Sequence, residues 1–467
     1  MRISLPEEMV DRFLIPGPSG EGFNIGLYLE HLEEASFLYE QRISLLDDPE
    51  LAWSDLHDFE ERFEAHIDAL VLGEQLALAV CRQRAEGGDF GELHAAVRVF
   101  CRQDRQDLVD EVLDALDPQD DERVKAVADA LCRELPEEWR LSFVQKWKEG
   151  LPAYKKVAVR ALGYRRLPVA AVLLEALPRA TDDAVLDIIW ALGRLRDPSA
   201  RPLLYNTYLK EGDASVKAAA ALALLRMGEP STLQHCVSIA RSQPWALLPI
   251  GLGGSQSNTG LLVELAASDG ASPECMLALG LLGDVSAVEP LLYHLGNARL
   301  AEKASIGLYL ITGAPLFEDV FIPELLDEDE LFEDERAHLE RDDRELPNSV
   351  EQRGETISRL SQQPEIWQDW WLQNKSSFER GTRYRTGRLY GAARLLENLT
   401  TEQSPRLVRW LAAEELVIRY NIDSPLEIDL FVAHQMDVLA DLDTRITDGA
   451  DRIDDGRWVL AGRAYPR

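Results

Sequence analysis

Apolar positions recur with a nearly constant period through the middle of the chain. A short phrase, Ala-Leu-Gly or a close variant of it, ends at residues 163, 193, 225, 251, 280 and 310, so that successive copies are 26 to 32 residues apart. Within each copy the apolar residues follow a helical period, and Ile188 and Leu192 correspond to Ala220 and Leu224 at a shift of 32 residues. A repeat of this length predicts an α-solenoid, in which each helix pair buries its apolar face by stacking on its neighbours.

The end of each phrase predicts a tight turn between two helices. Glycine allows the left-handed residue that ends a helix, and Pro198 and Pro230, at matching places after the phrase, prevent the helix from resuming at once. Cys101 and Cys132 continue the same phase backwards in steps of 31 residues from Gly163. The array therefore begins before its clearest copies.

The segments on either side of the array break the period. Helical patterns at about 25–42 and 53–72 predict an N-terminal cap, and three helices are expected at about 388–399, 405–420 and 425–441, the last opened by Ser424-Pro425. The expected fold is all-α: an α-solenoid of short helical repeats with an N-terminal helical cap and a C-terminal helical domain. The expected divisions are a flexible lead (1–22), the cap (23–90), the array (91–317), an acidic insertion or linker (318–350), the C-terminal domain (351–441) and a tail (442–467) that is weakly ordered or forms one edge strand.

The charge of the chain narrows its choice of partners. It has 49 Lys and Arg against 82 Asp and Glu, a net charge of −33, and residues 318–345 carry a large share of the acids. Such a charge repels phosphate backbones and anionic membranes and attracts basic surfaces. We therefore expect a protein partner, no nucleic acid and no membrane. Acids where a signal peptide would be apolar, and the lack of a long apolar run, predict a cytoplasmic protein.

The search for chemistry in the sequence finds no complete arrangement. The eight histidines include no His-Glu dipeptide and no pair at i, i+4, and the five cysteines (Cys81, Cys101, Cys132, Cys236 and Cys275) include no Cys-x-x-Cys and are expected to be buried. Gly251–Ser257 lacks the Gly-Lys-Ser/Thr end of a phosphate loop and is interpreted as a turn, and Asp327–Glu330 lacks the spacing of a calcium loop. We expect no metal, no cofactor and no catalysis.

Two clusters near the C-terminus are candidates for partner binding. They are the tryptophans Trp367, Trp370 and Trp371, and a basic-aromatic segment with Arg380, Arg383, Tyr384, Arg385 and Arg388. The tryptophans fit either core packing or an exposed anchor that dominates binding energy. The arginines fit either ion pairs with carboxylates of this chain, including those of residues 318–345, or a face for a partner. The sequence leaves both choices open.

The sequence also resembles known families. The phrase Ala191–Pro198, Ala-Leu-Gly-Arg-Leu-Arg-Asp-Pro, is similar to the short HEAT-like repeats first recognised in bilin lyases. Several phrases together resemble one family of bacterial HEAT-like proteins: His31–Ala35 with Leu38 and Arg42, Arg62–Leu70, Trp370-Trp371, Gly381–Tyr384 with Gly387, and Ala412–Leu416. Members of that family are often encoded beside type VI secretion genes, near spike, tip and toxin components. The resemblance implies no catalytic residues.

Three hypotheses about function follow. The first is a non-catalytic adaptor or chaperone whose acidic concave face holds a basic secretion effector or a spike or tip component before export. The second is an immunity protein that neutralises a toxin by direct binding. The third is an enzyme of lyase or protein-modifying type on a HEAT scaffold.

Overall fold

The computed structural model describes residues 18–46, 48, 51–149, 152–180, 182–210, 212–268, 271–323, 354–448 and 456–466. Three expectations fall partly or wholly elsewhere. The flexible lead before Pro18, residues 324–350 of the acidic insertion and residues 449–455 of the tail lie outside the described residues.

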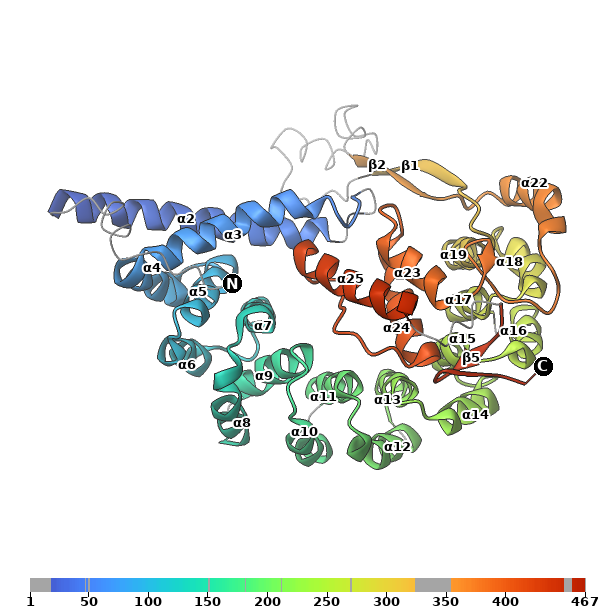
Figure 1. Ribbon diagram of the computed structural model, residues 1–467, viewed down its shortest axis with the longest axis horizontal. Coiled ribbons are helices and arrows are strands. Elements are labelled where there is room, and N and C mark those ends of the chain that lie inside the picture. Colours follow the sequence, from blue (N-terminus) through green and yellow to red (C-terminus); the bar gives the residue numbers. More distant parts are fainter. Residues whose placement is uncertain are drawn as a thin grey trace, which may run out of the picture.

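The chain begins with three packed helices, α2 (Pro18–Leu45), α3 (Leu56–Leu72) and α4 (Glu74–Gly87). Helix α2 starts before the first residue expected, and it packs against both α3 and α5. Leu32 of α2 and Phe63 and Ile67 of α3 are fully or almost fully buried. Two of these helices were predicted from their apolar periodicity, and α4 joins them to the array (Figure 1).

The array consists of two layers of helices that follow a curve (Figure 1). The inner layer comprises α5 (Phe90–Arg102), α7 (Asp121–Glu134), α9 (Pro152–Tyr164), α11 (Asp182–Leu195), α13 (Ala214–Arg226), α15 (Leu247–Gly253), α17 (Pro273–Leu282) and α19 (Ala301–Thr312). The outer layer comprises α6 (Gln106–Ala115), α8 (Arg140–Glu149), α10 (Ala170–Ala176), α12 (Arg201–Leu209), α14 (Pro230–Ile239), α16 (Thr259–Ala266) and α18 (Val288–His294). Single turns of 3₁₀ helix accompany these and a later helix: η1 (Glu137–Trp139), η2 (Leu177–Arg179), η3 (Pro198–Ala200), η4 (Pro244–Ala246), η5 (Gln256–Asn258), η6 (Val285–Ala287) and η7 (Lys375–Ser377).

The glycines of the repeated phrase have a different role from the one predicted. Gly163, Gly193, Gly251 and Gly280 all lie inside inner helices, where a Cβ would come within 2.4–3.0 Å of the next inner helix. At Gly280 that Cβ would come 2.4 Å from the Cα of Gly307. The left-handed residues come three positions later, at Arg166, Arg196, Gly228, Gly283 and Gly313. The phrase therefore marks the point where neighbouring inner helices approach most closely, and the turn follows it.

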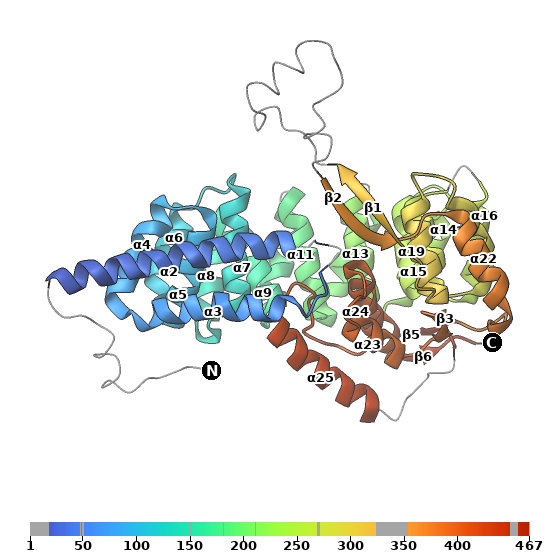
Figure 2. The ribbon, with the colours of Figure 1, turned by 90° about the horizontal axis from the view of Figure 1, so that it is seen from above.

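The C-terminal part combines helices with two-stranded antiparallel pairs. It comprises β1 (Phe317–Pro323) paired antiparallel with β2 (Gly354–Leu360), α22 (Pro364–Asn374), the hairpin β3 (Tyr384–Arg385) and β4 (Arg388–Leu389), α23 (Ala392–Thr400), α24 (Arg406–Tyr420), α25 (Val432–Asp448), and the hairpin β5 (Val459–Leu460) and β6 (Arg463–Ala464). Figure 1 shows α23, α24 and α25 inside the curve of the array, and Figure 2 shows that α25 extends beyond the array on one side. Helix α24 packs against α13 and α15 of the inner layer, and α25 packs against α3.

Two C-terminal elements differ from the prediction. The helix expected from Pro425 begins at Val432, because residues 421–431 cross the concave face instead of opening a helix. Asn421, with φ of 57°, ends α24 in the left-handed conformation. In the tail, Trp458 and Val459 are buried, and β5 packs against α24.

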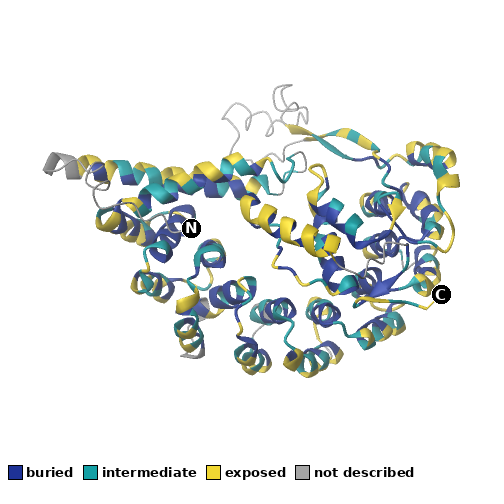
Figure 3. Cartoon of the chain, viewed as in Figure 1, coloured by how far each residue is buried: buried dark blue, intermediate teal, exposed yellow. Residues whose placement is uncertain are grey.

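The core is continuous from the cap to the C-terminal hairpin. One cluster of buried apolar side chains runs from Tyr28 to Leu460, and a second lies within the C-terminal domain around Leu416 and Leu442. Figure 3 shows the inner helices largely buried and α25 with an exposed outer side. All five cysteines are buried and unpaired, as expected. Within the described ranges no helix is long and apolar enough to cross a membrane.

Candidate functional site

Arginines line the concave face where the inner helices end. Arg102, Arg133, Arg194 and Arg226 lie in the last turn of α5, α7, α11 and α13, and Arg166 lies just beyond α9. We call these five residues the arginine row. Several arginines here donate to the last carbonyl groups of an inner helix, as Arg226 Nε does to Gly193 O (3.2 Å) and Arg196 Nε to Arg226 O (2.7 Å). The negative end of each helix dipole favours a cation at this place.

The middle of the row holds α24 through ion pairs. Glu414, which is 2% exposed, accepts Arg226 Nη1 at 2.7 Å and lies 3.2 Å from Arg194 Nη2. Arg194 also pairs with Glu427 (Nε–Oε1 2.6 Å). Burial alone would raise the pKa of Glu414, but Arg226 and Arg194 hold it below its ordinary value. The carboxylate is therefore ionised and fixed between two array helices.

The segment 421–431 continues this contact toward the cap. Arg166 pairs with Asp423 (2.7 Å) and donates to the carbonyl of Ser424. Farther along, Arg42 of α2 donates to Asp429 O (2.8 Å), and its guanidinium lies 4.4 Å from the ring centre of Phe431. Residues 421–431 thus contact the cap through Arg42 and the array through Arg166, although these arginines are hundreds of positions away in the sequence. The segment therefore joins the cap, the array and the C-terminal domain.

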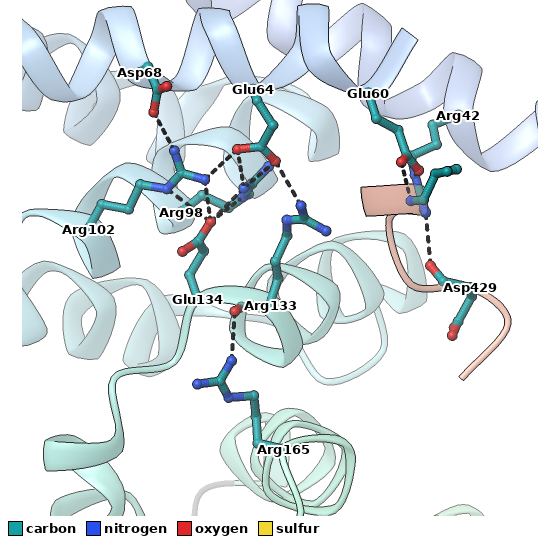
Figure 4. A network of polar contacts seen from close by, with 11 residues as sticks. Arg42, Glu60, Glu64, Asp68, Arg98, Arg102, Arg133, Glu134, Arg165 and Asp429 are labelled. Carbon is teal, nitrogen blue, oxygen red and sulfur yellow. Dashed lines mark hydrogen bonds and ion pairs between the residues drawn. The ribbon is translucent and has the colours of Figure 1, made fainter. Parts of the chain in front are cut away.

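A second network lies at the cap end of the row (Figure 4). Glu64 of α3 accepts Arg98 (2.8 Å), Arg102 (2.5 Å) and Arg133 (3.0 Å), and Glu134 accepts Arg98 and Arg102. Burial would raise the pKa of Glu64, but the three arginines lower it to about 2. This network joins α3 to α5 and α7 by charge-assisted hydrogen bonds.

The predicted basic segment is also part of the interior. Arg383 and Arg385 are 0% and 1% exposed, and both donate to Glu415 of α24, at 2.8 Å and 2.6 Å. Arg383 also donates to Leu281 O at the end of α17 (2.7 Å), and Tyr384 is buried beside it. Arg383 and Arg385 therefore form ion pairs within the described chain, and the carboxylate that both of them contact is Glu415.

The remaining candidates are divided between core and surface. Trp367 and Trp371 are buried, and their indole nitrogens donate to Ser361 O (2.7 Å) and Glu289 Oε1 (3.2 Å). Trp370 is half-buried, whereas Arg380 and Arg388 are exposed. Five of the eight proposed partner-binding residues are therefore inaccessible to a partner in this structure.

The electrostatic expectation for the concave face is wrong. It was expected to be acidic and to receive a basic cargo, but it carries the arginine row and is covered by α24 and residues 421–431. The acidic residues that fill it belong to the same chain.

The ion pairs on this face include Arg194 with Glu427 and Arg166 with Asp423. In the parts of the chain that are described, no group of three or more His, Cys, Asp or Glu is placed to hold a metal ion. One contact that the sequence search missed joins His31 and His66, whose Nδ1 atoms lie 3.0 Å apart on α2 and α3. Burial and the neighbouring His31 lower the pKa of His66.

The residues that form the site carried one signal in the sequence. Glu414 and Glu415 are adjacent acids between Leu411 and Leu416, on a helix whose neighbouring positions are apolar. Paired acids at buried positions of a helix imply buried cations elsewhere, because an unpaired buried charge is strongly unfavourable. The regular placement of arginine after the repeated phrase supplied those cations.

Comparison with known proteins agrees with the architecture. A family model for HEAT repeats matches residues 170–248, which run from α10 into α15. This part of the chain is HEAT-like, and the whole fold is an all-α solenoid. A search of curated proteins found no match to the chain.

Proposed function

We propose that this chain is a non-catalytic protein-binding scaffold whose partner contacts its outer surface and not its concave face. HEAT repeats are commonly scaffolds for protein interaction, which supports a binding role. The observation that carries the proposal is the docking of the C-terminal domain on the arginine row, through Glu414 and Glu427. A solenoid that fills its own concave face offers the remaining surface to partners.

The charge distribution favours a basic partner. Eight arginines are buried in the described structure, against the five buried carboxylates of Glu60, Glu92, Asp284, Glu414 and Glu415. The interior thus retains an excess of cations, and the accessible surface of a chain with net charge −33 is correspondingly richer in acids. Complementary charge speeds encounter and selects partners.

One acidic stretch lies on the outer layer near the cap. Along α6 and the turn after it, Asp107, Glu111, Asp114 and Asp117 are exposed. Two of them pair with Arg105 and Arg82, and these arginines are themselves partly or largely exposed. We take this stretch as the contact for the basic surface of a partner. Trp370 is a further candidate contact at the other end of the array, where the exposed Arg380 and Arg388 require acidic groups on the same partner.

The biological setting rests on the family resemblance. We propose an adaptor or chaperone that holds a secretion effector, or a spike or tip component, in the cytoplasm of a bacterium with a type VI system. The partner is a protein, and neither nucleic acid nor membrane is involved. Neutralisation of a toxin is the competing outcome that the genetic test below separates.

The test combines capture with charge-reversal variants. The tagged full chain captures its partner from the cytoplasm of its own host, and the association rate of the purified pair is measured against salt. We expect a basic partner and an association rate that falls as salt rises. Asp114→Lys with Asp117→Lys slows association, whereas the control Asp443→Lys, at an exposed acid on α25 outside both proposed contacts, does so less.

The genetic arm separates the two roles. Loss of secretion without self-intoxication on deletion of the gene supports the adaptor, and self-intoxication relieved by deleting a neighbouring toxin gene supports immunity. Capture of neutral or acidic partners alone contradicts the electrostatic argument.

A further inference from the structure

A cavity of about 310 Å³ lies between α4, α5 and α6, three helices that pack against one another near the cap (Figure 1). All the residues that line it belong to the described part of the chain. Several of them, among them Glu86, Glu111 and Ala115, are exposed, so the cavity opens at the surface. Small-molecule sites commonly measure roughly 300–1,000 Å³, and a volume at the lower end of this range suits one side chain of a partner.

The interior of this cavity is apolar. Its accessible apolar wall includes Ala115, which is exposed, and Val112, which is half-buried, both on α6. Leu93 and Phe100 of α5 also line the cavity and are fully buried. Such a wall favours methylene groups over water.

The edge of the cavity is charged, and its two cations are already engaged. Arg82 bridges α4 and α6 through its ion pair with Glu111 (Nε–Oε2 2.9 Å). Arg123 of α7 donates to two carbonyl groups at the end of α4, Gly88 O (2.8 Å) and Ala85 O (2.6 Å). Both guanidinium groups therefore have acceptors within this chain.

Three further carboxylates at the edge are not engaged in this way. They belong to Glu86, Asp117 and Asp120, and no cation of the described residues lies within 4 Å of them. Asp117 accepts the backbone N–H of Gln119 (2.9 Å), and Asp120 accepts that of Arg123 (3.1 Å). Four carboxylates thus line the cavity against two guanidinium groups, and the excess charge favours a cation.

We propose that this cavity receives a lysine or arginine side chain of the basic partner. Its methylene groups pack against the apolar wall, and its terminal cation lies among Glu86, Asp117 and Asp120 at the edge. A long basic side chain matches both halves of the cavity, whereas an apolar side chain matches only the wall. The inference rests on the proposed function, because it names the group of the partner that the acidic stretch of α6 recognises.

The test uses short fluorinated peptides and the full chain. The probes are trifluoroacetyl-Gly-Arg-Gly-amide and the two peptides with lysine or norleucine in place of arginine. Broadening of the trifluoromethyl signal in fluorine NMR measures weak binding as the protein is titrated. We expect saturable binding of the arginine or the lysine peptide, at least about tenfold tighter than that of the norleucine peptide.

Variants show whether binding occurs in the cavity. Ala115→Leu fills the opening without changing any charge and should weaken binding at least about tenfold, whereas Ala267→Leu, at an exposed alanine that ends α16, should not. Asp120→Asn removes one carboxylate but still caps α7, and should weaken binding about two- to fivefold. Its control is Asp213→Asn, at the exposed aspartate that caps α13.

The outcomes separate this inference from the proposed function. Equal binding of the norleucine peptide indicates an apolar occupant and overturns the inference, as does binding that neither Ala115→Leu nor Asp120→Asn weakens. If Ala115→Leu does not fold, Asp120→Asn decides between these outcomes. Salt-dependent association of a captured basic partner that Ala115→Leu leaves unchanged supports the proposed function and overturns the cavity as its contact. Capture of neutral or acidic partners alone contradicts the proposed function.

Discussion

Glu415 is the most sensitive single position in the C-terminal domain. Its side chain is 0% exposed; Oε1 accepts Arg383 Nη2 (2.8 Å) and the hydroxyl of Tyr390 (2.8 Å), and Oε2 accepts Arg385 Nη1 (2.6 Å). Glu415→Gln removes the charge and turns an NH₂ group toward donors. Hydrogen bonds to charged groups contribute about 1.5–3 kcal/mol each, and breaking a buried ion pair typically costs about 3–5 kcal/mol. We expect the free energy of unfolding of this domain to fall by about 3–5 kcal/mol.

Equilibrium urea unfolding measures this loss. Far-ultraviolet circular dichroism follows the whole helical array, and tryptophan fluorescence includes Trp367 and Trp458, which are buried in the C-terminal part. Because a repeat array need not unfold in one step, the fluorescence transition of Glu415→Gln should move to lower urea ahead of the helical signal. The matched control is Glu397→Gln, a half-exposed carboxylate that pairs with Arg394. It should lose at most about 1 kcal/mol. Identical midpoints for the two variants would refute the reasoning.

Three other predictions concern the cap, the array and the connection between them. In the folded protein the pKa of Glu64 is about 2, below its ordinary value of 4.5. The ionised carboxylate therefore stabilises the fold above pH 4.5, and this stabilisation is lost as the pH falls toward 2. In thermal melting, Glu64→Gln should be less stable than wild type by about 2–3 kcal/mol at pH 7, and the two proteins should have nearly equal stability at pH 2. Gly280→Ala forces α17 and α19 apart and should lower the free energy of unfolding, measured by urea titration, by about 1–3 kcal/mol. The control Gly260→Ala should leave that free energy unchanged, because its added Cβ meets nothing within 4 Å. Phe431→Ala removes a ring that lies 3.0 Å from the guanidinium of Arg133 and should increase hydrogen exchange of α3 and α7, with exposed Phe37→Ala as the control.

The array could be predicted from the sequence because the pattern that produces its helices lies within each repeat. Each copy contains an apolar helical face, and Ile189 and Leu224 are fully buried where the period places them. The exact role of the glycines could not be predicted in the same way. A glycine such as Gly163 fits both a turn and a close helix contact, and the choice depends on Ala191 of the next repeat.

The docking of the C-terminal domain could not be predicted from local pattern. Arg226 and Glu414 are 188 residues apart, and the sequence around either residue does not indicate that the other is its partner. The β1–β2 ribbon likewise pairs strands that are separated by a long insertion, with Phe317 opposite Leu360. Such contacts are decided by which surfaces meet after the helices have formed.

The candidate site shows the same limit. Tryptophans and arginines favour binding surfaces and buried networks alike, so composition alone could not separate Trp367, which is buried, from Arg388, which is exposed. Burial depends on the place of the segment beside α17 and α24. The carboxylate that decides the question is Glu415, about 30 residues away in the sequence.

The central claim is that the C-terminal domain is docked on the arginine row. A double-mutant cycle of Arg226→Ala and Glu414→Ala tests it most directly, because these residues meet at 2.7 Å across the contact between α13 and α24. Urea unfolding of wild type, both single variants and the double variant gives the coupling free energy. The account predicts a coupling of at least about 2 kcal/mol, as expected for a buried charge pair. A coupling near zero would contradict it.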